Sequence, residues 1–172
     1  PVWELAAISG LEDRLIWNYG VACQWNTLFE PNNKMAGDKL GVWMVVNDFR
    51  SHAITDGLSG KRGVFYLARG LVENPNGLRN SSAAPLARTS GESYEKIPDI
   101  RKTSNISTSE EYEAYVQEFL ERDKLEDEAV GSFVLGYAVE RRLRPPAWQR
   151  RKGIRENKKT RMVVYGTSTP SR

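Results

Sequence analysis

The sequence predicts an α+β domain in which a mixed β-sheet, curled into a barrel, packs beside one long helix. Three observations lead to this prediction. Short apolar runs rich in Val, Trp, Phe and Tyr alternate with clusters of Gly, Asn, Asp and Pro, which is typical of strands joined by turns. One segment near Tyr112 has the helical spacing of apolar residues. A length of 172 residues suits a single domain that covers residues 1–172.

Four apolar runs are predicted as strands, namely residues 40–46, 64–72, 131–139 and 162–165. Residues 15–25, which Gly20 interrupts, are predicted as a strand that leads into a short helix. The runs 40–46 and 64–72 are expected to pair across the polar loop 47–63. Residues 74–107 are rich in Asn, Ser, Gly and Pro and predict an extended connection.

The predicted helix begins at the capping-box sequence Ser107-Thr108-Ser109-Glu110. Apolar residues then recur at i, i+3, i+4, i+7 and i+8, namely Tyr112, Tyr115, Val116, Phe119 and Leu120. We expect this face to belong to the core.

Positive charge is concentrated near the end of the chain. The net charge is only +3, yet ten of the 25 basic residues lie between Arg141 and Arg161, where Glu156 is the only acid. Such a basic strip attracts polyphosphates, and nucleic acid is the expected partner. A solvated tail is the alternative interpretation. Apolar residues inside the strip, including Trp148, indicate that part of it packs.

The cysteine count and hydropathy bear on the compartment. Cys23 is the only cysteine, so no disulfide within the chain and no cysteine zinc site is expected. No apolar stretch approaches the roughly twenty residues that cross a bilayer. The prediction is an intracellular, cytoplasmic protein without a membrane contact, a metal or a cofactor.

The order of several residue runs resembles the EVE domains of the PUA-like superfamily. The runs are the early Leu15-Ile16-Trp17-Asn18-Tyr19, then Gln24-Trp25-Asn26, the Gly37-Asp38 turn before Leu40-Gly41-Val42-Trp43-Met44, and residues 62–75 with Gly63-Val64-Phe65 and Val72-Glu73-Asn74-Pro75. The resemblance covers about sixty residues, while the loop 47–62 is longer than expected for the family.

The resemblance implies a PUA-like β-barrel with flanking helices that reads a modified base, flipped out of a DNA duplex. It also implies a role in a modification-dependent restriction system, with a fused or associated nuclease. Trp17, Asn18 and Trp25 carry over as pocket residues by the family's pattern. Trp43 and Tyr66 are added because a flipped base needs an aromatic face on which to stack. Structural packing is the alternative role for each tryptophan.

Polar residues near the strand ends complete the predicted site. Asn18, Asn26 and Asp48 are expected to address the base edge. The residues expected to contact phosphates are Arg50, Lys61, Arg62, Arg141, Arg142, Arg144, Arg150, Arg151, Lys152, Arg155, Lys158 and Lys159.

Catalytic patterns are scarce, so a binding domain is favoured over an enzyme. His52 is the only histidine, and no HExxH, HNH or Gly-x-Ser-x-Gly motif is present. Two alternatives stay open. One is an RNA-binding PUA-like module, and the other is a small Mg²⁺-dependent nuclease that uses Asp99, Glu156 and Lys158.

Overall fold

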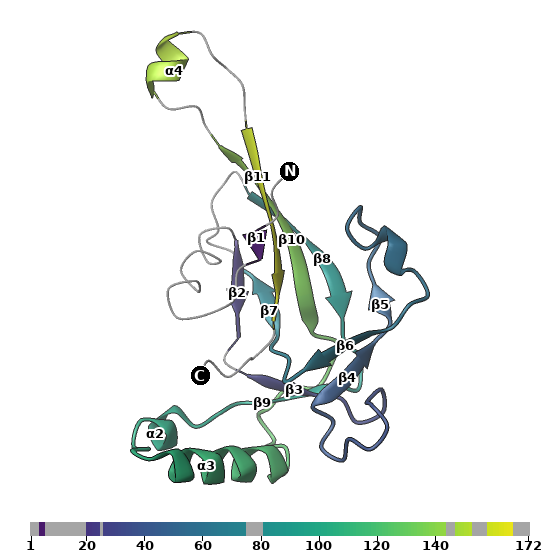
Figure 1. Cartoon of the computed structure of the whole chain (residues 1–172), viewed down its shortest axis with the longest axis vertical. Helices are drawn as coiled ribbons and strands as arrows, with labels where there is room; N and C mark the ends of the chain where they lie inside the picture. Colours follow the sequence, from purple (N-terminus) through teal and green to yellow (C-terminus); the bar gives the residue numbers. More distant parts are fainter. Residues whose placement is uncertain are drawn as a thin grey trace.

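The computed structural model describes residues 4–5, 20–24, 26–74, 81–143, 147–152 and 158–166. The described chain is mostly β-sheet with few helices, which confirms the predicted α+β class at this level. Figure 1 shows an elongated molecule with strands in the centre and helices at the two ends of the long axis. No helix in these ranges has the length and apolar composition needed to cross a membrane.

The main sheet of the described chain has seven strands and is organised around β10 (Val134–Leu143). This strand pairs antiparallel with β8 (Ser81–Arg88) and with β11 (Lys158–Tyr165), and at Val134 also with β7 (Leu71–Glu73). The outer strands are β1 (Glu4–Leu5) beside β11, β2 (Val21–Cys23) beside β7, and β5 (Asp48–Phe49) beside β8.

Two smaller sheets flank the main one. One pairs β4 (Trp43–Val46) with β6 (Gly63–Tyr66), and the other pairs β3 (Thr27–Phe29) with β9 (Tyr94–Lys96). Single backbone hydrogen bonds continue the pairing between sheets, since the Leu28 N–H donates to the Ala68 carbonyl at 2.8 Å. The described strands do not form a closed barrel.

Two hydrophobic clusters fill the two faces of the main sheet. One contains Val139 and Met162, and the other contains Met44 and Leu135. Leu135 and Val139 are four residues apart on β10, so strict alternation would place them on one face, but register shifts between Val134 and Tyr137 interrupt that alternation. In the β4–β6 hairpin the alternation is regular, which buries Met44 and Val46 and turns Trp43 outward.

The predicted helix is α3 (Ser109–Glu121), and it begins with a capping box one residue later than the predicted Ser107–Glu110. Thr108 is the N-cap residue: its hydroxyl accepts from the Glu111 N–H, and the Glu111 carboxylate accepts from the Thr108 N–H. The predicted core face is buried only at Phe119, while Tyr112 is exposed. The prediction that the whole face is core is therefore wrong, because α3 lies on one end of the molecule (Figure 1).

Two strand predictions also need correction. The run 64–72 is not one strand but β6 and β7, separated by a bend in which Leu67 has a φ of +45°. The connection 74–107 contains β8, a central strand, together with β9 and the short helix α2 (Ile100–Thr103). Strand β8 lacks the usual strand composition, because Ser81, Ser82, Ala83, Ala84 and Pro85 open it.

The short helix expected within residues 21–25 is instead the strand β2, whereas the predicted strands 131–139 and 162–165 overlap β10 and β11. The hairpin across loop 47–63 is confirmed, with Trp43 opposite Tyr66, and the loop contains β5 and the short 3₁₀ helix η1 (Asp56–Leu58). Residues 15–19 lie outside the described ranges. The basic strip is partly built into the sheet, since it forms the outer ends of β10 and β11 and the short helix α4 (Ala147–Arg151).

Candidate nucleic-acid interface

The outward face of the β4–β6 hairpin is apolar and exposed. Trp43 and Tyr66 face each other across the two strands and are 43% and 40% exposed, and Val64 is exposed beside them. Aromatic side chains usually lose more of their surface than this on folding. The hairpin therefore presents two large rings that the protein itself does not cover.

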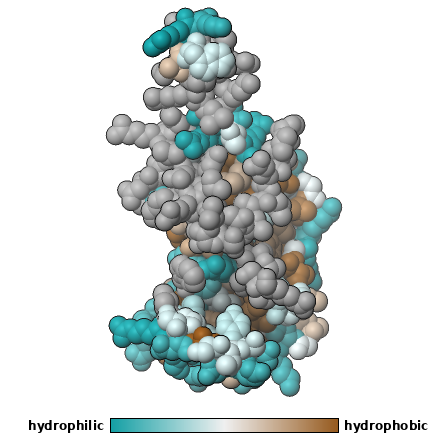
Figure 2. Space-filling model, turned by 60° about the vertical axis from the view of Figure 1, so that its left-hand side comes forward, coloured by the Kyte–Doolittle hydropathy of each residue, from teal (hydrophilic) through white to brown (hydrophobic). Residues whose placement is uncertain are grey.

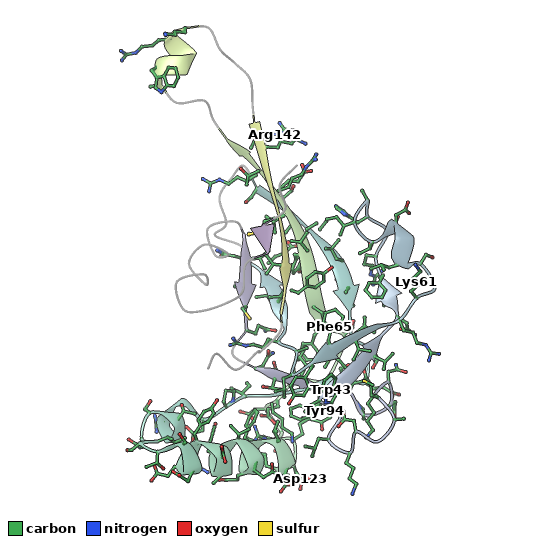
Figure 3. All side chains as sticks on the ribbon, in the orientation of Figure 1. Trp43, Lys61, Phe65, Tyr94, Asp123 and Arg142 are labelled. Carbon is green, nitrogen blue, oxygen red and sulfur yellow. The ribbon has the colours of Figure 1, made fainter. Side chains whose placement is uncertain are left out.

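An open groove with a volume of about 670 Å³ lies against this aromatic pair. Trp43, Tyr66 and Val42 form one side, the loop 35–40 forms another, and Leu120 and Glu121 at the end of α3 close it. The loop 35–40 leads into Val42 and Trp43, whereas Tyr66 and the end of α3 come from segments far away in the sequence. Figure 3 shows Trp43 on the same end of the molecule as α3.

The Gly37-Asp38 turn shapes the loop wall of the groove. One Asp38 carboxylate oxygen accepts from the N–H groups of Leu40 and Gly41 at 3.0 Å, and the other accepts from the Trp43 N–H at 2.7 Å. Gly37 adopts a φ of +89°, which a residue with a Cβ rarely accepts. The dipeptide thus works as a turn that fixes the start of β4 beneath the Trp43 ring.

Buried charges anchor the helical wall. Lys96 is buried, its ammonium donates to the Leu120 carbonyl at 2.8 Å, and it lies 4.3 Å from the centre of the Phe29 ring. Burial, and then the nearby Arg122, lower the pKa of Lys96. A cation at the C-terminus of a helix satisfies carbonyls that have no partner within the helix. Lys96 therefore holds the end of α3 beside the groove.

Glu128 stabilises the same region through a buried ion pair. Its carboxylate accepts from Arg122 and from the backbone N–H groups of Ile97 and Leu125. Burial alone would raise the pKa of Glu128, but the hydrogen bonds from Arg122, Leu125 and Ile97 outweigh it and lower the pKa below its ordinary value of 4.5. Glu128 is consequently ionised at neutral pH.

The aromatic rings form a platform rather than a clamp. The centroids of Trp43 and Tyr66 are 4.3 Å apart with an angle of 31° between the ring planes. A planar base held between two rings would need them about 7 Å apart, twice the stacking repeat of about 3.4 Å. A base can stack on this pair but cannot enter between the two rings as they stand.

Among the residues that the structure describes, the other predicted base-contacting residues do not line this groove. Trp17, Asn18 and Trp25 lie outside the described residues. Asn26 is 3% exposed: its amide donates to Glu95 at 2.6 Å and its carbonyl accepts from the Gly70 N–H at 3.0 Å. The structure places Asn26 in the interior rather than on a pocket rim.

Asp48 and the phosphate candidates of the long loop lie on another side of the body. Asp48 pairs with Arg50 at 3.2 Å, and both side chains are partly exposed. Lys61 and Arg62 are exposed next to Gly63, at the end of the hairpin opposite to Trp43 and Tyr66. Figure 3 shows Lys61 on the outer edge of the loop, away from Trp43.

The basic strip forms a projecting arm. Beyond the last pair between β10 and β8, at Arg141 and Ser81, the chain continues as a two-stranded ribbon that carries α4 at its tip (Figure 1). Arg142, Arg151, Lys152 and Lys159 are exposed there. Arg144 and Arg155 lie outside the described ranges, and only the backbone of Arg150 and Lys158 is described.

The arm also carries an aromatic residue that the sequence analysis assigned to packing. Trp148 is 58% exposed, and the Lys152 ammonium lies 5.9 Å from its ring centre. Figure 2 shows hydrophilic residues at this tip and at the opposite end over α3. The position of Trp148 within a basic segment of the sequence was the feature that could have indicated a ligand-contacting residue.

The two halves of the predicted site are well separated. Figure 3 shows Arg142 near one end of the long axis and Trp43 near the other. Strand β10 runs between these ends, and its residues from Leu135 to Arg142 alone span about 23 Å. A single nucleotide cannot contact both the aromatic groove and the arm.

The residues of the nuclease alternative are not brought together. Asp99 accepts from the Arg101 N–H at 2.9 Å at the start of α2, whereas Lys158 begins β11 at the opposite end of the molecule (Figure 1). Glu156 lies outside the described residues. Within the described ranges, no group of three or more His, Cys, Asp or Glu side chains could hold a metal ion.

Comparisons with protein-family models, with curated proteins and with solved structures give no match.

Proposed function

We propose that this domain binds nucleic acid and recognises a modified base in DNA, as the specificity module of a modification-dependent restriction system. In this proposal Trp43 and Tyr66 are the surface on which the extruded base stacks, and the basic arm contacts phosphates. The observation that carries it is the exposed Trp43–Tyr66 pair beside an open groove. Base stacking on an aromatic side chain contributes about 1–3 kcal/mol per base.

The distribution of charge supports the proposal. Ten basic residues and one acid occupy residues 141–161, and the described part of this segment projects from the body. Phosphate contacts by Lys and Arg release counterions from the nucleic acid and favour binding at low salt. A projecting basic ribbon can approach a duplex without steric interference from the rest of the domain.

The proposal includes a PUA-like barrel as the finer description of the fold. Two segments of the chain pass from one sheet to another, which supports this description. In residues 43–49, β4 pairs with β6 in a small sheet and the following β5 pairs with β8 in the main sheet. In residues 63–73, β6 pairs with β4 in the small sheet and the following β7 pairs with β10 and β2 in the main sheet. Strands that pass from sheet to sheet in this way are typical of small barrels.

The platform geometry favours a second candidate, an RNA-binding module. Because the two rings contact each other, they offer one continuous surface and no enclosing slot. Unpaired bases of single-stranded RNA commonly stack on such exposed aromatic residues of a sheet. This module would bind single strands in preference to every duplex, whatever the base modification.

A binding panel separates the two candidates. Fluorescence anisotropy at fixed salt would compare plain, methylated, hydroxymethylated and glucosylated DNA duplexes with single-stranded RNA. A reader binds one modified duplex more tightly than the plain one, and Trp43→Ala removes that difference, a loss of roughly 5- to 150-fold for one stacked base. Tighter binding to single-stranded RNA than to all duplexes selects the second candidate.

The matched control is Tyr112→Ala, which removes an exposed aromatic ring from α3, outside the groove. This variant should keep the wild-type discrimination. Equal affinity of the wild-type protein for modified and plain duplexes would overturn the reader proposal.

A further inference from the structure

A second recess lies at the base of the basic arm, on the face of the main sheet next to the loop after β5. It has a volume of about 430 Å³ and is lined by His52, Ala53, Ile54, Glu140, Arg161 and Val163. Small-molecule sites commonly fall between about 300 and 1,000 Å³. Loop residues form one wall and strands β10 and β11 form the other, so the recess exists only in the folded chain.

Hydrogen bonds across the two strands position the Glu140 carboxylate of the recess. Glu140 and Arg161 are cross-strand partners, and the Arg161 Nε–H donates to Glu140 at 2.9 Å. The Lys159 ammonium donates to the other carboxylate oxygen at 2.9 Å. The hydrogen bond from Lys159 has the largest effect and, together with that from Arg161, lowers the pKa of Glu140. Glu140 is therefore an ionised acceptor with further lone pairs for a ligand.

His52 lines the same recess from the loop, and a backbone hydrogen bond selects its tautomer. Its Nδ1 accepts from the Ile54 N–H at 3.2 Å, so the neutral ring carries its proton on Nε2. In the described part of the chain, Nε2 has no hydrogen-bond partner, and the two Nη groups of Arg161 have none either. The recess therefore offers one strong acceptor and two kinds of donor between the apolar side chains of Ile54 and Val163.

This set of groups suits an uncharged base better than a phosphate. A phosphate inside the recess would be repelled by the Glu140 carboxylate, whereas an exocyclic amino group would donate to it. Cytosine presents along its Watson–Crick edge one amino donor, N4, and two acceptors, N3 and O2. Thymine presents acceptors at both ends of that edge and would place O4 against the carboxylate.

The surroundings supply the phosphate contacts that a nucleotide needs. Arg142 and Lys159 are cross-strand partners two pairs further along the ribbon from Glu140 and Arg161. Pairs two residues apart along a strand lie on the same face, so these cations continue the face that lines the recess. A strand laid along this face meets cations next to a base-sized hollow.

We propose that the His52–Glu140–Arg161 recess binds an unpaired cytosine of a nucleic-acid strand whose phosphates lie on the Arg142–Lys159 face of the arm. Glu140 accepts from N4, and His52 Nε2–H and the Arg161 guanidinium donate to N3 and O2. The inference rests on the proposed nucleic-acid binding and adds a base-selective site separate from the Trp43–Tyr66 groove.

Glu140→Gln tests the proposal because it should raise the overall affinity for single strands while it lowers the preference for cytosine. Anisotropy titrations would use single-stranded DNA homopolymers of cytosine, thymine and adenine with the full chain. The wild-type protein should prefer the cytosine strand by roughly tenfold. In Glu140→Gln the freed Lys159 and Arg161 should raise the affinity for all three strands, while the cytosine preference falls severalfold.

Two further variants complete the test. His52→Ala should weaken binding to the cytosine strand and leave the thymine strand unchanged, and Ala53→Phe should do the same by filling the recess. Glu118→Gln removes the same charge from an exposed ion pair on α3 and should leave the preference intact. Thermal unfolding of each variant would show that it is folded.

The outcomes distinguish the two proposals. Failure to bind any DNA or RNA would overturn the proposed function and this inference with it. Binding without a cytosine preference, or with a preference that Glu140→Gln and His52→Ala leave unchanged, would overturn the inference alone. In that case the Glu140 cluster is only a cross-strand ion-pair network.

Discussion

At the scale of single residues, the main distinction is between charges that build the fold and charges that remain available to a ligand. Glu128 and Lys96 are buried and fully engaged around the end of α3. Arg142, Arg151 and Lys152 are exposed on the arm. The sequence displays all of these as ordinary charged residues, so their opposite roles follow from burial.

Glu128→Gln should destabilise the protein by about 2–3 kcal/mol at pH 7, because Arg122 loses its charged partner while remaining partly hydrated. The folded-state pKa of Glu128 is depressed, so its stabilising effect is full above about pH 4.5 and is lost as the pH falls through the lower folded-state value. Urea unfolding of the variant and the wild type at pH 7 and pH 3 measures this.

The difference in the free energy of unfolding between the wild type and Glu128→Gln should be smaller at pH 3 than at pH 7. A constant difference across this pH range would show that the Glu128 carboxylate is not the group responsible. Glu118→Gln is the control, since the exposed pair with Lys102 should contribute little at either pH.

At the scale of elements, the arm is a β-ribbon whose two faces differ. Arg142 pairs with Lys159 on the face that carries Glu140 and Arg161, whereas the neighbouring Arg141 pairs with Thr160 on the other face. Strand alternation thus separates two adjacent arginines of identical chemistry. They form a matched pair for testing which face contacts phosphate.

Arg142→Ala should reduce the slope of log K against log salt for DNA binding by about one unit, because one phosphate contact is lost. Arg141→Ala removes the same charge from the opposite face and should change the slope less. Titrations at several salt concentrations measure both slopes. Equal slopes for the two variants would contradict contact through the Glu140 face.

At the scale of the whole molecule, the aromatic groove and the arm lie at opposite ends (Figure 3). A nucleic acid that contacts both must extend over more than the roughly 23 Å covered by residues 135–142 of β10. At about 3.4 Å per base this corresponds to roughly seven to ten nucleotides. Affinity should therefore depend on ligand length in a stepwise manner.

Oligonucleotides of increasing length should show weak binding until this span is reached and then a marked gain, because the second contact becomes intramolecular. Trp43→Ala should weaken binding of long ligands and leave short ligands bound at the arm unaffected. Anisotropy with a length series provides the measurement. A smooth rise with length and a constant effect of Trp43→Ala would contradict a two-site arrangement.

The predictability of the fold differed between its parts for physical reasons. The β4–β6 hairpin and α3 carry local signals, namely β-branched and aromatic runs and a capping box, and both were predicted. Strand β8 carries small residues and Pro85, and it is a strand because β10 and β5 hold its two edges. Its pairing partners lie far away in sequence, so local composition could not reveal it.

The sequence by itself determined which chemical groups the protein has available for a ligand: a concentrated basic segment, several tryptophans, one cysteine and one histidine. It also determined the Gly37-Asp38 turn, since that turn depends on one positive φ and one short carboxylate. These properties are local, and short-range chemistry is sufficient to define them.

Only the tertiary structure decided which of these residues lie together. It buried Asn26, exposed Trp43 and Trp148, and placed His52 beside Glu140 and Arg161. Each outcome depends on long-range strand pairing and on which face of a strand a residue occupies. A shift of one residue in register would reverse every one of those faces, and that register is set by packing over the whole sheet.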